Sequence, residues 1–138
     1  MQKRDKELLL HFILVVEHLR TISFYKKNPL IKEIVTKIKP ACQGILVIFG
    51  SYAKGNQNKE SDLDLFLAGK YDPKIIRKIG EKYGIEINIK QYPFPLFKKA
   101  LSGEDHLVQE VIKDHIIISE ADTFVLLLIK KWAENHDI

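Results

Sequence analysis

Two apolar runs joined by a short polar connection constrain the fold more than any other part of this chain. Residues 44–50 read Gly-Ile-Leu-Val-Ile-Phe-Gly, a β-branched run bounded by glycines that predicts a buried strand. A polar loop over 56–61 follows, and the next apolar run predicts a second strand over 62–68. The sequence therefore predicts a strand–turn–loop–strand unit, with Gly50 and Ser51 at the turn.

The residues at the two ends of this connection suit phosphate and metal. Gly50 lets the backbone turn sharply and approach a ligand closely, and the Ser51 hydroxyl and neighbouring N–H groups can donate to phosphate oxygens. Asp62 and Asp64 are two residues apart in a strand, so their side chains point to one face, with Cα atoms about 6.5 to 7 Å apart. Mg²⁺ prefers carboxylate and phosphate oxygens. The pattern indicates a phosphoryl-transfer site.

A third acid comes from the stretch Ile85-Glu86-Ile87-Asn88-Ile89-Lys90, which alternates cleanly and predicts a strand over 85–91. The isoleucines share one face, and Glu86, Asn88 and Lys90 share the other. If that polar face joins the one carrying the two aspartates, Glu86 completes an acidic triad. It could then bind metal or accept the proton of an attacking hydroxyl. The other interpretation places Glu86 on the solvated side of a half-exposed strand.

These motifs resemble the DNA polymerase β-type nucleotidyltransferase superfamily, and within it the minimal nucleotidyltransferase (MNT) group. MNT members often read Gly-Ser-x-Ala-x-Gly followed by Ser-Asp-x-Asp-Leu. The matching positions are Gly50, Ser51, Ala53, Gly55, Ser61, Asp62, Asp64 and Leu65. The resemblance covers roughly residues 39–119. One departure is that the third acid is Glu86, where many members carry Asp.

The resemblance implies a small mixed β-sheet with helices packed against it, and transfer of a nucleoside monophosphate to an acceptor hydroxyl. It implies Asp62, Asp64 and Glu86 as the catalytic residues and ligands of two Mg²⁺ ions, with ATP as donor. Gly50 and Ser51 would bind the nucleotide. MNT proteins are often paired with HEPN-domain toxins, which they neutralise by adenylylating a tyrosine. Transfer to a small molecule or an RNA end, or non-catalytic nucleotide binding, remain alternatives.

Three further charged residues have competing interpretations. Asp72 precedes Pro73, and an Asp N-cap followed by proline at the first helical position explains it without a catalytic role. Lys54 and Lys59 lie in the connection beside the proposed phosphate site, so each could contact phosphate. A lysine in a polar loop is also commonly solvated.

The rest of the chain is expected to form helices around the strands. Hydrophobic periodicity and turn residues predict helices over 5–20, 29–38, 73–82, 94–101, 105–113 and 121–135, with a short strand over 115–118. This mixture predicts an α/β or α+β fold. At 138 residues the chain is expected to form one nucleotidyltransferase domain, with N-terminal helices (1–38), a catalytic core (39–119) and a C-terminal helix (120–138).

Composition limits the classes of partner. The net charge is +4, and the lysines are scattered without an interleaved aromatic platform, so nucleic acid is not favoured as a partner. Cys42 is the only cysteine, which excludes an internal disulfide or a Cys-rich zinc site. The five histidines form no cluster with metal-ligand spacing. The expected location is the cytoplasm.

Two apolar segments near the ends, 8–16 and 124–129, are shorter than the roughly 20 residues that span a bilayer. Acidic residues at positions 5, 7 and 17 flank the first segment, and no small-residue cleavage site follows it. Both segments are therefore expected to belong to terminal helices. Those helices are either buried in the monomer core or used as the interface of a homo-oligomer or partner complex.

Overall fold

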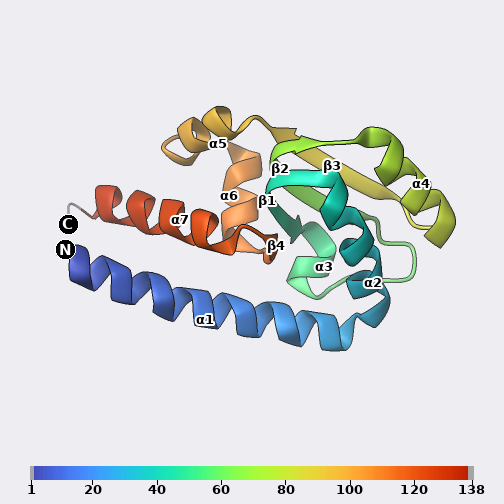
Figure 1. The fold of residues 1–138 in the computed structure, drawn as a ribbon, viewed down its shortest axis with the longest axis horizontal. Helices are drawn as coiled ribbons and strands as arrows, with labels where there is room; N and C mark the ends of the chain where they lie inside the picture. Colours follow the sequence, from blue (N-terminus) through green and yellow to red (C-terminus); the bar gives the residue numbers. More distant parts are fainter. Residues whose placement is uncertain (1, 137–138) are drawn as a thin grey trace.

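The computed structural model describes residues 2–136, which form a four-stranded sheet with helices on both faces (Figure 1). Met1 and residues 137–138, parts of the predicted 1–38 and 120–138 segments, lie outside the described residues. The elements in chain order are α1 (Lys3–Lys27), α2 (Pro29–Ile38), the 3-10 turn η1 (Lys39–Ala41), β1 (Cys42–Phe49), α3 (Gly50–Lys54), β2 (Leu63–Tyr71), α4 (Pro73–Tyr83), β3 (Ile87–Tyr92), α5 (Phe94–Leu101), α6 (His106–Lys113), β4 (Ile116–Ser119) and α7 (Ala121–Asn135). The mixed α/β fold is confirmed.

The sheet has the strand order β3-β2-β1-β4 and is mixed in direction. β1 pairs antiparallel with both β2 and β4, whereas β2 and β3 run parallel. A parallel pair needs a crossover connection, and α4 supplies it. The C-terminal end of β1 therefore meets the start of β2, and the start of β3 lies on the other side of β2 at the same end of the sheet.

Each face of the sheet has its own apolar core. On one face, α2 and α4 cover β-strand residues such as Leu46, Ile48 and Leu65. On the other face, α5, α6, α7 and the first half of α1 cover residues such as Val47 and Phe66. The alternation of side chains along a strand accounts for this division. In Figure 1, α1 and α7 lie side by side.

The main difference from the predicted elements is the length of α1, which continues to Lys27 instead of ending near residue 20. Residues 21–25 include Thr, Ile, Phe and Tyr, which are weaker helix formers. Tertiary contacts hold this last part in place, because Phe24 is buried and the Thr21 hydroxyl donates to the Ile117 carbonyl at 3.1 Å. Contacts of this kind override local propensity, and they are not readable from periodicity.

Other element boundaries were predicted more closely. Helices 29–38, 94–101 and 121–135 are confirmed at both ends, and the Asp72 side chain accepts from the Lys74 N–H at 3.0 Å, as expected of an N-cap. The predicted strand 85–91 begins two residues later, at Ile87. Residues 50–54 form the short helix α3, whereas the sequence predicted only a turn. Five residues are too few to carry a helical period.

A buried contact between a glutamate and a histidine fixes α1 to the rest of the structure. Glu17 of α1 and His115, just before β4, are 7% and 5% exposed, and His115 Nε2 lies 3.2 Å from Glu17 Oε1. The other ring nitrogen, Nδ1, lies 2.9 Å from the Val111 carbonyl oxygen. The two ring nitrogens of His115 thus contact a carboxyl of α1 and a carbonyl of α6.

This pair sets the ionisation of Glu17. Burial raises the pKa of Glu17, but the hydrogen bond from His115 and its charge, with smaller contributions from Arg20 and His18, act in the opposite direction and leave the pKa below its ordinary value. A carboxyl with a lowered folded-state pKa stabilises the fold above its unfolded pKa. That stabilisation is lost as pH falls through the folded-state pKa.

Replacing Glu17 by Ala is therefore expected to destabilise the protein by about 1–3 kcal/mol near neutral pH, because it leaves a buried donor of His115 unsatisfied. Urea unfolding measures the change. The difference between wild type and variant should shrink as pH falls below the ordinary carboxyl range. Glu7→Ala, at an exposed position of the same helix, serves as control, and an equal loss in both variants would contradict the interpretation.

Candidate active site

Two aspartates and an asparagine meet at the end of the sheet where β1 finishes and β2 begins. In the sheet register Asp64 stands opposite Phe49 of β1 and Asn88 of β3. The Asn88 side-chain amide donates to Asp62 Oδ2 at 3.3 Å and to Asp64 Oδ1 at 3.4 Å. One amide thus joins both carboxylates, and all three side chains are half-buried.

Gly50 brings the backbone directly against this carboxylate pair. It is buried, has φ +71°, and begins α3 immediately after β1. A Cβ atom at this position would lie 2.6 Å from Asp64 Oδ2, so only glycine leaves the carboxylate in its place. Ser51 follows and is half-buried. The structure therefore brings Gly50 and Ser51 to the same end of the sheet as the aspartates.

The polar loop before Asp62 is held by its own hydrogen bonds. The Asn58 N–H donates to the Ser61 hydroxyl at 2.8 Å, and the Ser61 N–H donates to the Asn58 carbonyl at 3.1 Å. The Glu60 N–H donates to Asn58 Oδ1 at 2.8 Å. Side chains of Asn and Ser commonly stabilise turns in this way. The loop delivers Asp62 to the start of β2 with a defined backbone.

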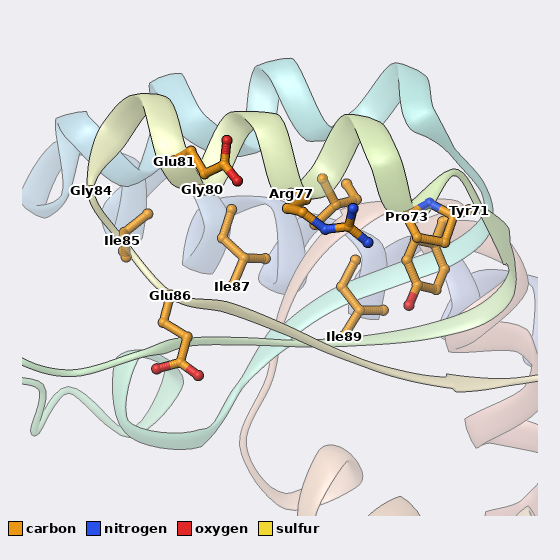
Figure 2. Close-up of a pocket in the computed structure, with 11 residues that line it drawn as sticks. Tyr71, Pro73, Arg77, Gly80, Glu81, Gly84, Ile85, Glu86, Ile87 and Ile89 are labelled. Carbon is orange, nitrogen blue, oxygen red and sulfur yellow. The ribbon is translucent and has the colours of Figure 1, made fainter.

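Glu86 directly precedes β3, and its side chain makes no hydrogen bond with the aspartates. The Leu63 N–H donates to the Glu86 carbonyl at 2.9 Å, which places Glu86 one strand away from Asp62. The Glu86 side chain is exposed, and Figure 2 shows it pointing away from Ile87 and Ile89. Within residues 2–136, no three His, Cys, Asp or Glu side chains form a group close enough to hold a metal ion.

Strand alternation predicted that Asn88 shares a face with Glu86, but it indicated no function for Asn88. Its contact with both aspartates depends on the parallel register that sets Asp64 beside Asn88. No sequence motif around Asn88 indicates its contact with the two aspartates. The only sequence signal is the alternation of the strand, which puts positions 86 and 88 on one face.

The two lysines of the connection lie elsewhere. Lys54 Nζ is 3.6 Å from Glu110 Oε1 of α6, and both side chains are more than one-third exposed. An exposed pair of this kind contributes little to stability. Lys59 is exposed in the loop. The Lys54 side chain thus points toward Glu110 of α6, and Lys59 is a solvated loop residue.

A groove of about 540 Å³ lies between α4 and β3, and Glu86 is among the residues that line it (Figure 2). Its floor is formed by Ile85, Ile87 and Ile89, whose side chains point to the face opposite the aspartates. Arg77 and Glu81 also line the groove, but neither Asp62 nor Asp64 does. The chemistry is therefore assigned to the carboxylates and not to the groove.

The donor set at the end of the sheet suits a divalent cation. Two half-buried carboxylates lie there, and the absence of a side chain at Gly50 lets the backbone approach Asp64 without displacing it. Mg²⁺ usually takes one or two protein carboxylates and completes its shell with water and substrate phosphates. Asp62 and Asp64 fit that requirement.

Among known protein families, residues 28–138 match the model described as nucleotidyltransferase domain. A protein of Methanocaldococcus jannaschii, named putative protein adenylyltransferase MJ0604, is 34% identical over 83 residues, covering 55% of this chain and 83% of that protein.

Two solved structures are similar to this chain at low sequence identity. One is a toxin–antitoxin with AMP-PNP, which is 15% identical and covers 78% of this chain and 86% of that chain, with a TM-score of 0.44. The other is a mutant of the toxin–antitoxin MntA–HpeT, which is 14% identical and covers 79% and 88%, with a TM-score of 0.46. At these TM-scores the similarity supports no further conclusion.

Proposed function

This chain belongs to the nucleotidyltransferase domain family, and we propose that it transfers AMP from ATP to a hydroxyl group of an acceptor protein. The observation that carries the proposal is the half-buried pair Asp62 and Asp64, joined by Asn88 and approached by the backbone at Gly50. The name of the Methanocaldococcus jannaschii relative supports an adenylyl group and a protein acceptor.

In this proposal each site residue has a defined task. Asp62 and Asp64 hold Mg²⁺, which when bound neutralises phosphate charge and orients the triphosphate. Gly50 and Ser51 offer backbone and hydroxyl donors to the outer phosphates. Glu86, exposed at the edge of the site, accepts the proton of the attacking hydroxyl.

The reaction is an in-line displacement at the α-phosphorus of ATP. The acceptor oxygen forms a bond to that phosphorus while the bond to the bridging oxygen of the β-phosphate breaks, and pyrophosphate leaves with the electron pair. The proton lost by the acceptor passes to Glu86. Most of the rate enhancement comes from positioning and from stabilising negative charge.

Asn88 is assigned a positioning role, because its amide contacts both carboxylates. Asn88→Ala is expected to lower kcat by about 10- to 100-fold, the cost of losing a group that orients metal ligands. It should also raise the Mg²⁺ concentration needed for half-maximal rate. Asn88→Gln, which keeps the amide donor, should retain more activity than Asn88→Asp, which replaces the donor by a third negative charge beside Asp62 and Asp64. An unchanged Mg²⁺ requirement in Asn88→Ala would show that Asn88 does not position the carboxylates.

The acceptor in this proposal is a tyrosine of a HEPN-domain toxin, which would make the protein an antitoxin. The MNT resemblance of the sequence supports this choice. The structure is compatible with a protein acceptor, because the described residues form one small sheet with its helices and leave the carboxylates at an open end. A partner would then complete the enclosure of the reacting groups.

Transfer to a small molecule or to an RNA end is the second candidate, and nucleotide binding without transfer is the third. All three use the same carboxylates, so the site does not separate them. The product does: labelled protein, labelled RNA and labelled small molecule are distinct species.

Incubation of the protein with native-host lysate, Mg²⁺ and ATP labelled at the α-phosphate tests the proposal. One discrete labelled protein band, present with wild type and absent with Asp62→Asn, is expected. Mass spectrometry of that band should place AMP on a tyrosine. Label that appears only in RNA or in a small molecule would replace the protein acceptor by the second candidate.

A further inference from the structure

Five apolar side chains follow one face of α1 and remain uncovered. Their spacings along the helix are four, three, four and three residues, and each is between 51% and 68% exposed. In Figure 1, α1 runs along one side of the molecule, and none of the elements within residues 2–136 lies over the face turned away from the sheet. These residues, called the outer seam below, are Leu8, Phe12, Val15, Leu19 and Ile22.

The opposite face of α1 is already used by the fold. Leu10, Ile13 and Leu14 pack against the core of the sheet face that α7 covers, and Phe24 packs against the other core. The helix is therefore apolar on two opposite sides. A helix that is apolar all round is normally buried all round, so the outer seam lacks a covering partner in the monomer.

α1 also lies outside the part of the chain that matches the family. The nucleotidyltransferase family model begins at residue 28, one residue after α1 ends. The outer seam therefore lies outside the segment that the family model matches.

The spacing of the outer seam identifies what covers it. Alternating steps of four and three residues are the a and d positions of a heptad repeat, whose partner is another helix packed by knobs into holes. We propose that the partner is α1 of a second copy of this chain, packed antiparallel, so that the protein is a homodimer.

The amount of apolar surface fits a dimer. Together with the neighbouring Val16, the outer seam exposes on the order of 600 Å² per copy, which is close to the area that each partner contributes to a standard protein interface. This is also at the upper limit of what a monomer usually leaves open in one patch. Coverage by a second copy would remove the patch from both molecules at once.

The outer seam is self-complementary in the antiparallel direction. There, Phe12 of one copy lies opposite Val15 of the other, a large side chain against a small one, and Leu8 lies opposite Leu19. A parallel pair would stack Phe12 on Phe12 and bring Lys26 against Lys26. The antiparallel pair also places the helix dipoles in their favourable orientation. An isologous interface of this kind closes at two copies.

A membrane is the competing occupant, since α1 is long and apolar enough to cross one, with a mean hydropathy of 1.4 over its most apolar window. A single such helix near the N-terminus is weak support. Entering a bilayer would break the Glu17–His115 pair and the Thr21 hydrogen bond to Ile117. A second α1 covers the outer seam without breaking either contact.

Sedimentation equilibrium of the purified chain, without nucleotide or acceptor, tests the proposal independently of the transferase assignment. Wild type is expected to be a dimer at micromolar concentration. Phe12→Glu should raise the dissociation constant at least about 30-fold, the effect of removing a central interface side chain. The control is Leu30→Glu, which changes an apolar side chain of α2 that is 55% exposed and lies outside the outer seam. Circular dichroism confirms that both variants are folded.

A monomeric wild type, or a Phe12→Glu variant that dimerises as wild type does, would overturn the proposal. Flotation of a monomeric wild type with phosphatidylcholine–phosphatidylglycerol vesicles, abolished by Phe12→Glu, would replace it with a membrane-binding face. Either result leaves the transferase assignment untouched, because the carboxylates are on the sheet and not on α1.

Disulfide cross-linking tests the antiparallel direction. Burial raises the pKa of the Cys42 thiol to about 11, so this thiol reacts slowly, and Cys42→Ser removes it altogether. In that background, the double variant Leu8→Cys with Leu19→Cys should form covalent dimers on oxidation, whereas each single variant should not. Covalent dimers from the single variants would indicate the parallel pair and overturn the antiparallel one.

Discussion

Replacing Asp62 by Asn is expected to lower the rate of nucleotidyl transfer at least about 1,000-fold, the upper range for removing one electrostatic group from an active site. The change keeps the size of the side chain and removes its charge, so one of the two carboxylates proposed to hold Mg²⁺ becomes a neutral amide. The amide can still occupy the end of β2 beside Asn88. The unfolding midpoint in urea should therefore stay close to that of wild type.

The measurement is initial rate against Mg²⁺ concentration, with ATP labelled at the α-phosphate. Glu81→Gln is the matched control, because Glu81 is an exposed acid of α4, on the other face of the sheet. Its rate should be unchanged. Wild-type turnover by folded Asp62→Asn would remove Asp62 from the site and leave the transferase assignment without its central residue.

Features of the site and its surroundings that depend on residues close together in the chain could be predicted from the sequence. Strand alternation put Asp62 and Asp64 on one face, and the structure brings both carboxylates within reach of one amide. The role of Asp72 as a helix cap rested on two adjacent residues and is confirmed. These features depend on neighbours within a few residues, so the pattern in the sequence was sufficient.

The parts that depend on contacts between distant segments could not be read in this way. Asn88 contacts the aspartates because β2 and β3 run parallel in one particular register. That register cannot be predicted from the alternation of residues along each strand. The continuation of α1 to Lys27 depends on Phe24 and on the contact between Thr21 and β4. The sequence left open whether the terminal helices are buried in the monomer or form an interface, and the outer seam of α1 is exposed in the monomer.

A substitution at Gly50 gives a second test of the site, because it would displace the Asp64 carboxylate without changing its charge. Gly50→Ala is expected to reduce transfer at least about 100-fold, because a displacement of about 1 Å in a reacting group has a cost of that size. The new Cβ would lie 2.6 Å from Asp64 Oδ2, so either the carboxylate or the start of α3 must move. The residue also keeps φ near +71°, which costs a non-glycine residue roughly 1–2 kcal/mol.

The chain offers a control for that second effect. Gly55 ends α3 with φ +77°, and a Cβ atom there would meet nothing within 4 Å. Gly55→Ala should thus have the same backbone penalty without the displacement of Asp64. Stability and transfer rate are measured for both variants. If both lose stability but only Gly50→Ala loses transfer, the close approach of the backbone to Asp64 is what the site requires, and equal losses of transfer would instead attribute the effect to backbone strain.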